Sequence, residues 1–117
     1  MMKSVVKSIG EQAINEKEPL LILFDESATE ELKKFSIVQS FEGETRKALT
    51  EGSVISFDDQ EYTVTQVGPI ANEHLQSMGH VTVVFKETAD EDQLVNALYV
   101  KPFNLPKIKT GTVITYN

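Results

Sequence analysis

Short runs of β-forming residues, separated by glycine and proline, most constrain the fold of this chain. Such runs, rich in β-branched and aromatic residues, recur along all 117 residues and indicate strands. We expect strands at 3–9, 20–24, 35–40, 52–57, 61–67, 81–85, 94–100 and 111–116. Helical spacing of apolar residues predicts a helix at 70–78. Ser27 and Glu30 match a capping box, which predicts a second helix from Ala28 to Lys34.

This pattern predicts an all-β protein: a small closed or partly open β-barrel with one or two short helices. Closure is favoured because an open sheet of such short apolar strands would leave its edges unpaired. Leu20–Phe24 is a continuous apolar run and is typical of a strand buried on both faces. A chain of this length builds one core, so we expect a single domain over residues 1–117.

One internal echo also favours a barrel. Residues 49–57 and 108–116 share the pattern aliphatic, two polar, Gly, hydroxyl, Val, Ile, hydroxyl, aromatic. A solenoid needs three or more repeats. We therefore expect two strands that enter the sheet through the same glycine turn, as repeated corners of a small barrel would.

Composition limits the classes of function. The chain has no cysteine, which excludes disulfides, thiolate catalysis and cysteine-bound zinc. Its net charge of −7, from 18 acidic and 11 basic residues, repels nucleic acid and anionic lipid, so we expect no nucleic-acid partner. The acidity serves solubility and also suits transient docking to a basic partner. We find no signal peptide and no membrane span, and expect a cytoplasmic protein that is not embedded in a membrane.

Both histidines lie in the central stretch 67–85. His80 follows Gly79 and opens a strand, so backbone can hold one side of its ring while the other side faces solvent. An imidazole whose other nitrogen is fixed by a hydrogen bond can accept a phosphoryl group, and Thr82, on the same face, can donate to a phosphoryl oxygen. The alternative for His80 is a hydrogen-bonded structural residue, and the alternative for His74 is an exposed helical residue.

Other chemistry has little support in the sequence. The chain contains no nucleophile elbow, no phosphate-binding glycine loop and no zinc-protease motif. The two histidines do not have the spacing of a helical metal pair, and no third ligand is evident near them. We therefore expect neither a metal nor another cofactor.

The segment Gly79-His80-Val81-Thr82 is the most specific part of a similarity that spans nearly the whole chain. Further matching residues are Ile9-Gly10, Gly43-Glu44, Ala48-Leu49, Gly52, Gln66-Val67-Gly68, Ala71, Asn72, Leu75 and Phe85. With these residues the chain resembles the enzyme IIA component of the glucitol/sorbitol-specific sugar phosphotransferase system. The resemblance implies a small cytoplasmic β-barrel phosphocarrier. Its histidine would take a phosphoryl group from the histidine phosphocarrier protein and pass it to the enzyme IIB unit of the IIB/IIC sugar permease.

The chain departs from this family at one important position. The resemblance places the family's phosphoacceptor histidine at the end of the strand that starts at Phe35, where this chain has Gln39. An amide is not nucleophilic, although it can donate a hydrogen bond. The family's second histidine corresponds to His80.

Three hypotheses follow. In the first, His80 is the phosphoacceptor, Gln39 donates to the developing oxyanion, and Gly79 and Thr82 bind the phosphate. In the second, the protein is a non-phosphorylating regulatory relative that binds the same partners. In the third, it is a generic β-barrel binding module, and the resemblance concerns the fold alone. An exposed edge strand would also allow a homodimer.

Overall fold

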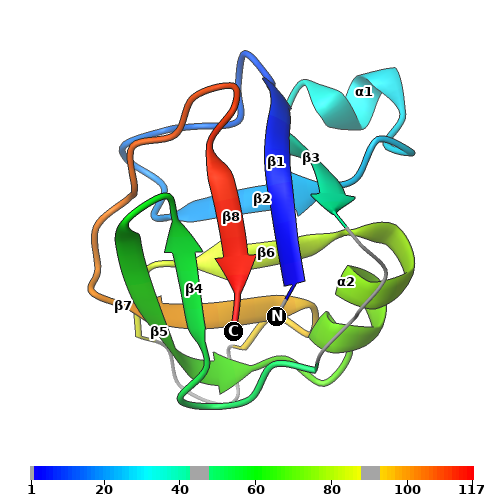
Figure 1. The fold of residues 1–117 in the computed structure, drawn as a ribbon. Coiled ribbons are helices and arrows are strands. Elements are labelled where there is room, and N and C mark those ends of the chain that lie inside the picture. The colour runs from blue at the N-terminus through cyan, green and yellow to red at the C-terminus, as the bar shows by residue number, and fades with distance from the viewer. Residues whose placement is uncertain (1, 43–47, 88–92) are drawn as a thin grey trace.

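The structure is a computed structural model that describes residues 2–42, 48–87 and 93–117. The Gly43-Glu44 match lies outside these residues. Eight strands form a closed barrel in the order β1-β3-β2-β6-β7-β5-β4-β8, so the predicted all-β barrel is confirmed. In Figure 1, β1, β8 and β4 lie in front of the more horizontal β2, β6 and β7. Within the described ranges, no helix is long and apolar enough to cross a membrane.

The two helices and eight strands agree closely with the expected segments. The strand expected over 94–100 begins only at Ala97, because residues 94–96 form a turn in which the Ala97 N–H donates to the Leu94 carbonyl (3.4 Å). The elements are β1 (Met2–Ile9), β2 (Leu20–Phe24), α1 (Glu30–Lys33), β3 (Ile37–Glu42), β4 (Val54–Phe57), β5 (Gln60–Val67), α2 (Ala71–Met78), β6 (Val81–Val84), β7 (Ala97–Lys101) and β8 (Val113–Tyr116).

Strand β2 is buried on one face only. Leu21 and Leu23 point into the barrel and are 1% and 0% exposed. Leu20, Ile22 and Phe24 point outward and are half-buried. The expectation of a strand buried on both faces is therefore wrong, because successive side chains alternate across a strand and a small barrel has only one inner face.

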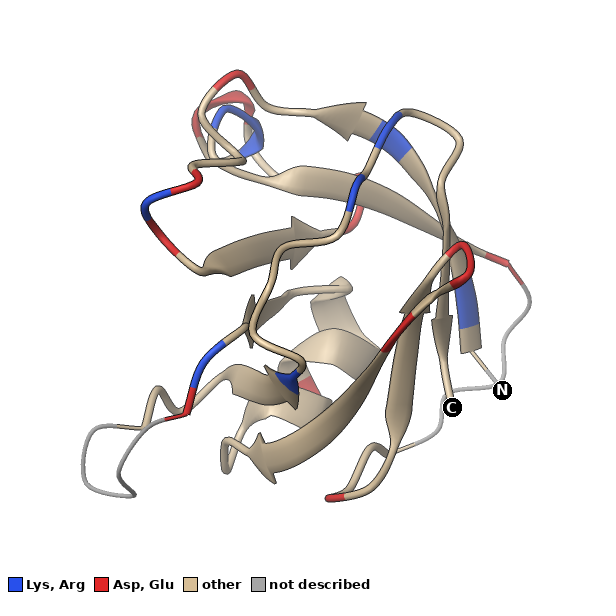
Figure 2. Cartoon of the chain, turned by 90° about the vertical axis from the view of Figure 1, so that its left-hand side faces the viewer, with Lys and Arg blue, Asp and Glu red and all other residues tan. Residues whose placement is uncertain are grey.

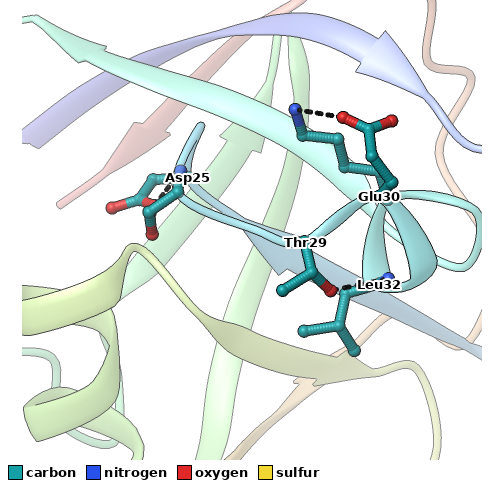
Figure 3. Close-up of polar contacts among 6 residues, drawn as sticks. Asp25, Thr29, Glu30 and Leu32 are labelled. Carbon is teal, nitrogen blue, oxygen red and sulfur yellow. Dashed lines mark hydrogen bonds and ion pairs between the residues drawn. The ribbon is translucent and has the colours of Figure 1, made fainter.

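Helix α1 is capped by a different residue from the one predicted. The Thr29 hydroxyl accepts from the Leu32 N–H (3.3 Å), so Thr29 is the N-cap and the helix begins at Glu30 (Figure 3). Ser27 instead donates through both its N–H and its hydroxyl to the Asp25 carboxylate. The capping box was misplaced because the carboxylate of Asp25 engages Ser27 in a turn before the helix starts.

Two similar half-barrels make up the structure, which confirms and extends the internal echo. The first half-barrel comprises β8, β1, β3 and β2, and the second comprises β4, β5, β7 and β6. In each, the second and third strands pair antiparallel with a register shift, and the third and fourth pair parallel. The halves meet at the antiparallel pairs β4·β8 and β2·β6. Ser56 pairs with Thr115, its own equivalent in the echo, so an approximate two-fold rotation relates the halves.

The loops that follow β1 and β5 are also equivalent. A Cβ at Gly10 or at Gly68 would lie only 2.1 or 2.4 Å from a backbone carbonyl oxygen, so both loops require glycine. The equivalent hydrogen bonds run from Gly10 N–H to Ser36 O (2.9 Å), Gly68 N–H to Ala97 O (2.8 Å), Gln12 N–H to Lys34 O (2.9 Å) and Ile70 N–H to Val95 O (2.9 Å). Phe35 in the first half-barrel therefore corresponds to Asn96 in the second.

The one-sided burial of β2 predicts unequal effects of two neighbouring truncations. Leu23→Ala should lower the free energy of unfolding by about 2–5 kcal/mol, because it leaves a cavity in the barrel core. Ile22→Ala, the matched control on the outer face, should cost less than about 2 kcal/mol, because this side chain is only partly buried and lies outside the barrel core. Urea denaturation of both variants measures the difference. Equal losses would contradict the assignment of the two faces.

Candidate functional site

His80 lies where β2 ends, α2 ends and β6 begins (Figure 1). Its Nδ1 is 3.1 Å from the carbonyl oxygen of Leu23, and its Nε2 is 3.1 Å from the side-chain Nδ2 of Asn96. A carbonyl oxygen only accepts hydrogen bonds, so Nδ1 carries the ring proton and donates it. Nε2 is then the basic nitrogen and accepts an N–H of the Asn96 amide. The two contacts together fix both the tautomer and the orientation of the half-buried ring.

Two aromatic rings stack on His80. The Phe24 ring, at the outer end of β2, lies 4.2 Å away between centroids, with 24° between the planes. The His74 ring, from α2, lies 6.0 Å away with 22° between the planes. The Nδ1 of His74 is buried and has no hydrogen-bond partner among the described residues. Stacking therefore fixes the plane of the His80 ring, and the two hydrogen bonds prevent the ring from rotating within that plane.

Helix α2 is anchored firmly enough to position this site. Two residues on the inner face of the helix, Ala71 and Leu75, are buried, at 0% and 1% exposure. The Asn72 side chain exchanges two hydrogen bonds with the backbone of Leu49, at 2.7 and 2.8 Å. Gly79 ends the helix in the left-handed region (φ 58°), where its Cβ would lie 2.6 Å from the Cβ of Asp25. Only glycine therefore fits the turn that delivers the chain into His80.

The structure does not support the role predicted for Gln39 as a donor to a phosphoryl group. Gln39 is 0% exposed and faces the barrel interior. Its Oε1 accepts from the Ser4 hydroxyl (2.6 Å) and from the Tyr116 hydroxyl, and its Nε2 donates to the Gly79 carbonyl (2.9 Å). The amide belongs to a buried polar network and does not face a partner protein. It acts on the site only indirectly, by fixing the peptide that precedes His80.

Gly79 and Thr82, the predicted phosphate-binding residues, are close to His80 in the chain but are less available than expected. The Gly79 N–H donates to the Leu75 carbonyl at the end of α2 (3.1 Å), so the helix already uses this donor. Thr82 lies on the outer face of β6, as His80 does, but is only 7% exposed. Its backbone N–H donates to the Asn96 carbonyl (3.2 Å). Phosphate binding by either residue remains a prediction.

Two members of the site, Phe24 and Asn96, were missed from the sequence. Phe24 closes the apolar run 20–24 and was assigned to the core, yet it stacks on His80 at the surface. Asn96 lies sixteen residues from His80 and was placed in a strand. No local pattern signals either contact, since each depends on which strands become neighbours in the barrel.

Charged residues lie mainly in loops, turns and strand ends, away from the barrel interior (Figure 2). The groups that contact the His80 ring are a backbone carbonyl, a neutral amide and aromatic rings. Asp25 follows Phe24 directly, but its carboxylate is engaged by Ser27. The imidazole is therefore positioned by neutral hydrogen bonds and stacking.

The buried network predicts a large difference between two conservative variants. Gln39→Leu should lower the free energy of unfolding by more than about 2 kcal/mol, since it leaves hydroxyls and a carbonyl buried without this partner. Tyr116→Phe should cost about 1 kcal/mol, because the Gln39 oxygen keeps its bond from Ser4. Urea denaturation with unchanged m-values measures both. A Gln39→Leu variant as stable as Tyr116→Phe would show that the network contributes little.

Comparison with known proteins gives a consistent result. Residues 1–115 match the family model described as the PTS system glucitol/sorbitol-specific IIA component. The chain is 33% identical over 115 residues to the PTS system glucitol/sorbitol-specific EIIA component of Escherichia coli (strain K12), covering 97% of this chain and 92% of that protein. The same-named protein of Shigella flexneri is 32% identical with the same coverage.

A solved structure agrees. The crystal structure of a PTS system IIA component from Enterococcus faecalis V583 superposes with a TM-score of 0.93 at 40% sequence identity, over 97% of this chain and 98% of that one. Sequence similarity of this extent overturns the hypothesis that the resemblance concerns the fold alone. The chain belongs to the glucitol/sorbitol-specific IIA component family of the sugar phosphotransferase system.

Proposed function

We propose that the protein is a cytoplasmic phosphocarrier of a glucitol/sorbitol-type phosphotransferase system and that His80 is its phosphoacceptor. The phosphoryl group comes from the phosphohistidine of the histidine phosphocarrier protein. From His80 it passes to the enzyme IIB unit of the IIB/IIC sugar permease. Family membership supports the pathway. The net charge of −7 suits brief encounters with partners that present a basic surface.

The observation that carries this proposal is the hydrogen bond from His80 Nδ1 to the Leu23 carbonyl. Because Nδ1 carries the proton, the lone pair available for attack is on Nε2. The ring sits outside the barrel at the start of β6 and is half-buried, so a partner can approach it without opening the core. An oriented imidazole with its second nitrogen fixed is what nucleophilic catalysis by histidine needs.

The transfer balances without any further reactant. The Nε2 lone pair of His80 attacks phosphorus as the nitrogen–phosphorus bond of the donor phosphohistidine breaks, and the bonding pair returns to the donor ring. The His80 ring then bears the phosphoryl group on Nε2 and its original proton on Nδ1, still donated to Leu23. That hydrogen bond strengthens as the ring gains positive charge, because hydrogen bonds from ionised donors are the stronger ones. Transfer to enzyme IIB reverses these steps.

A second candidate function is a non-phosphorylating regulatory relative that binds the same partners. Two observations favour it: Nε2 of His80 already accepts a hydrogen bond from Asn96, and the amide of Gln39 is sealed in the core. In this alternative the His80 surface is recognised but never modified.

Phosphorylation of the purified chain distinguishes the two functions. With phosphoenolpyruvate, the general phosphotransferase enzyme and its histidine carrier, we expect an acid-labile phosphoryl group on His80 that is lost in His80→Gln. His74→Gln is the matched control and should keep the label, as its ring only stacks on His80. Gln39→His should add no second label, because position 39 is buried.

Absence of label together with measurable binding to the carrier or to the permease subunit would replace the phosphocarrier with the regulatory relative. A label on any residue other than His80 would contradict the assignment of the acceptor while leaving the pathway in place.

A further inference from the structure

Asn96 is the polar side chain that contacts the nitrogen through which His80 would react. Its Nδ2 lies 3.1 Å from His80 Nε2 and donates to it. The phosphocarrier function proposed above assigns it no role. Any group that bonds to Nε2 must displace this hydrogen bond.

Three backbone hydrogen bonds hold the main chain around Asn96 in place. The flanking carbonyls of Val95 and Ala97 accept from Ile70 and Gly68 at 2.9 and 2.8 Å, and its own carbonyl accepts from Thr82 (3.2 Å). The side chain, by contrast, is only half-buried, and the hydrogen bond described for it is the one to His80. A change of side-chain torsion alone, with no movement of the backbone, would let the amide release Nε2 and remain beside it.

The first half-barrel provides an internal control for the identity of this residue. Its counterpart of Asn96 is Phe35, held between two equivalent backbone hydrogen bonds, and Phe35 is 45% exposed. The fold thus accepts an exposed aromatic ring at this position and does not require an amide there. The presence of an amide at residue 96 is explained by its contact with His80.

We propose that Asn96 is a phosphoryl-binding residue that exchanges partners during the reaction, an inference that rests on His80 being the acceptor. In the free protein its amide holds Nε2. As the Nε2–phosphorus bond forms, this nitrogen no longer has a lone pair to accept with, and the amide rotates to donate to a phosphoryl oxygen. The exchange is favourable because a hydrogen bond to a charged oxygen is stronger than one to a neutral ring nitrogen.

A small chemical donor tests this proposal without partner proteins. Potassium phosphoramidate phosphorylates histidine directly: the Nε2–phosphorus bond forms, the phosphorus–nitrogen bond of phosphoramidate breaks, and ammonia leaves. We expect Asn96→Ala to label His80 at least about tenfold more slowly, because a hydrogen bond to a developing negative charge is lost. Asn96→Asp should be slower still, since its carboxylate repels the phosphoryl group. Phe35→Ala, the counterpart in the other half-barrel, should react like the unmodified chain.

A second measurement reports the contact itself. In the unphosphorylated protein, the ¹⁵N shift of His80 Nε2 should move in Asn96→Ala toward that of a ring nitrogen without a donor, while the Nδ1 signal and the urea midpoint stay in place. A residue with a merely structural role would not move Nε2 alone.

The outcomes separate the two proposals. Equal labelling rates in all four proteins would overturn the role of Asn96 and leave His80 as the acceptor. Faster labelling of Asn96→Ala would also overturn it, because the amide would then act as a mask on Nε2. No label on His80 in any of the proteins would overturn the phosphocarrier function and this inference together.

Discussion

The pairing of β2 with β6 is the interaction on which the site depends. β2 belongs to the first half-barrel and β6 to the second, and their antiparallel pairing is one of the two seams that close the barrel. Leu23 and Phe24 reach the site from one side of this seam, and His80 and Asn96 reach it from the other. Closure of the barrel therefore fixes the imidazole tautomer. Neither half-barrel alone holds both the His80 ring and the Leu23 carbonyl that accepts the hydrogen bond from its Nδ1.

The same seam shows how two similar halves come to hold a single site. The approximate two-fold rotation passes through the pair Ile22 and Thr82, so the counterpart of His80 is Leu20. Leu20 packs against a separate apolar cluster of Val84, Ala97 and Tyr99. One end of the seam therefore contributes hydrophobic burial, while the other contains a half-buried imidazole and a buried Nδ1 of His74 without a described partner. A buried unpaired polar atom costs stability, so folding alone does not explain the polar end of the seam.

Local patterns in the sequence determined most of the elements. The alternation of residues around 54–67 and the glycine turn before β6 are short-range features, and the antiparallel strands β4 and β5 and the helix α2 lie where they were expected. One error was local: Asp25 engages Ser27, two residues further on, and Thr29 caps α1 instead. The other errors arose where a partner distant in the sequence decided the outcome. The outward position of Phe24 and the contact of Asn96 with His80 depend on strand order, which periodicity does not encode.

The pleat of β3 explains why Gln39 does not face a partner. Residues 37, 39 and 41 of this strand contribute to the interior, whereas Ser40 pairs with half-buried Val5 and faces outward. A shift of one residue along a strand transfers a side chain from one face to the other. A histidine on β3 that meets a partner protein would thus need to occupy an outward position such as 40 rather than 39. Position 39 is a glutamine and position 40 is a serine. Whichever of the two corresponds to the family's histidine, β3 has no imidazole there. Of the two histidines in the chain, His80 is the one whose proton is fixed by a backbone carbonyl.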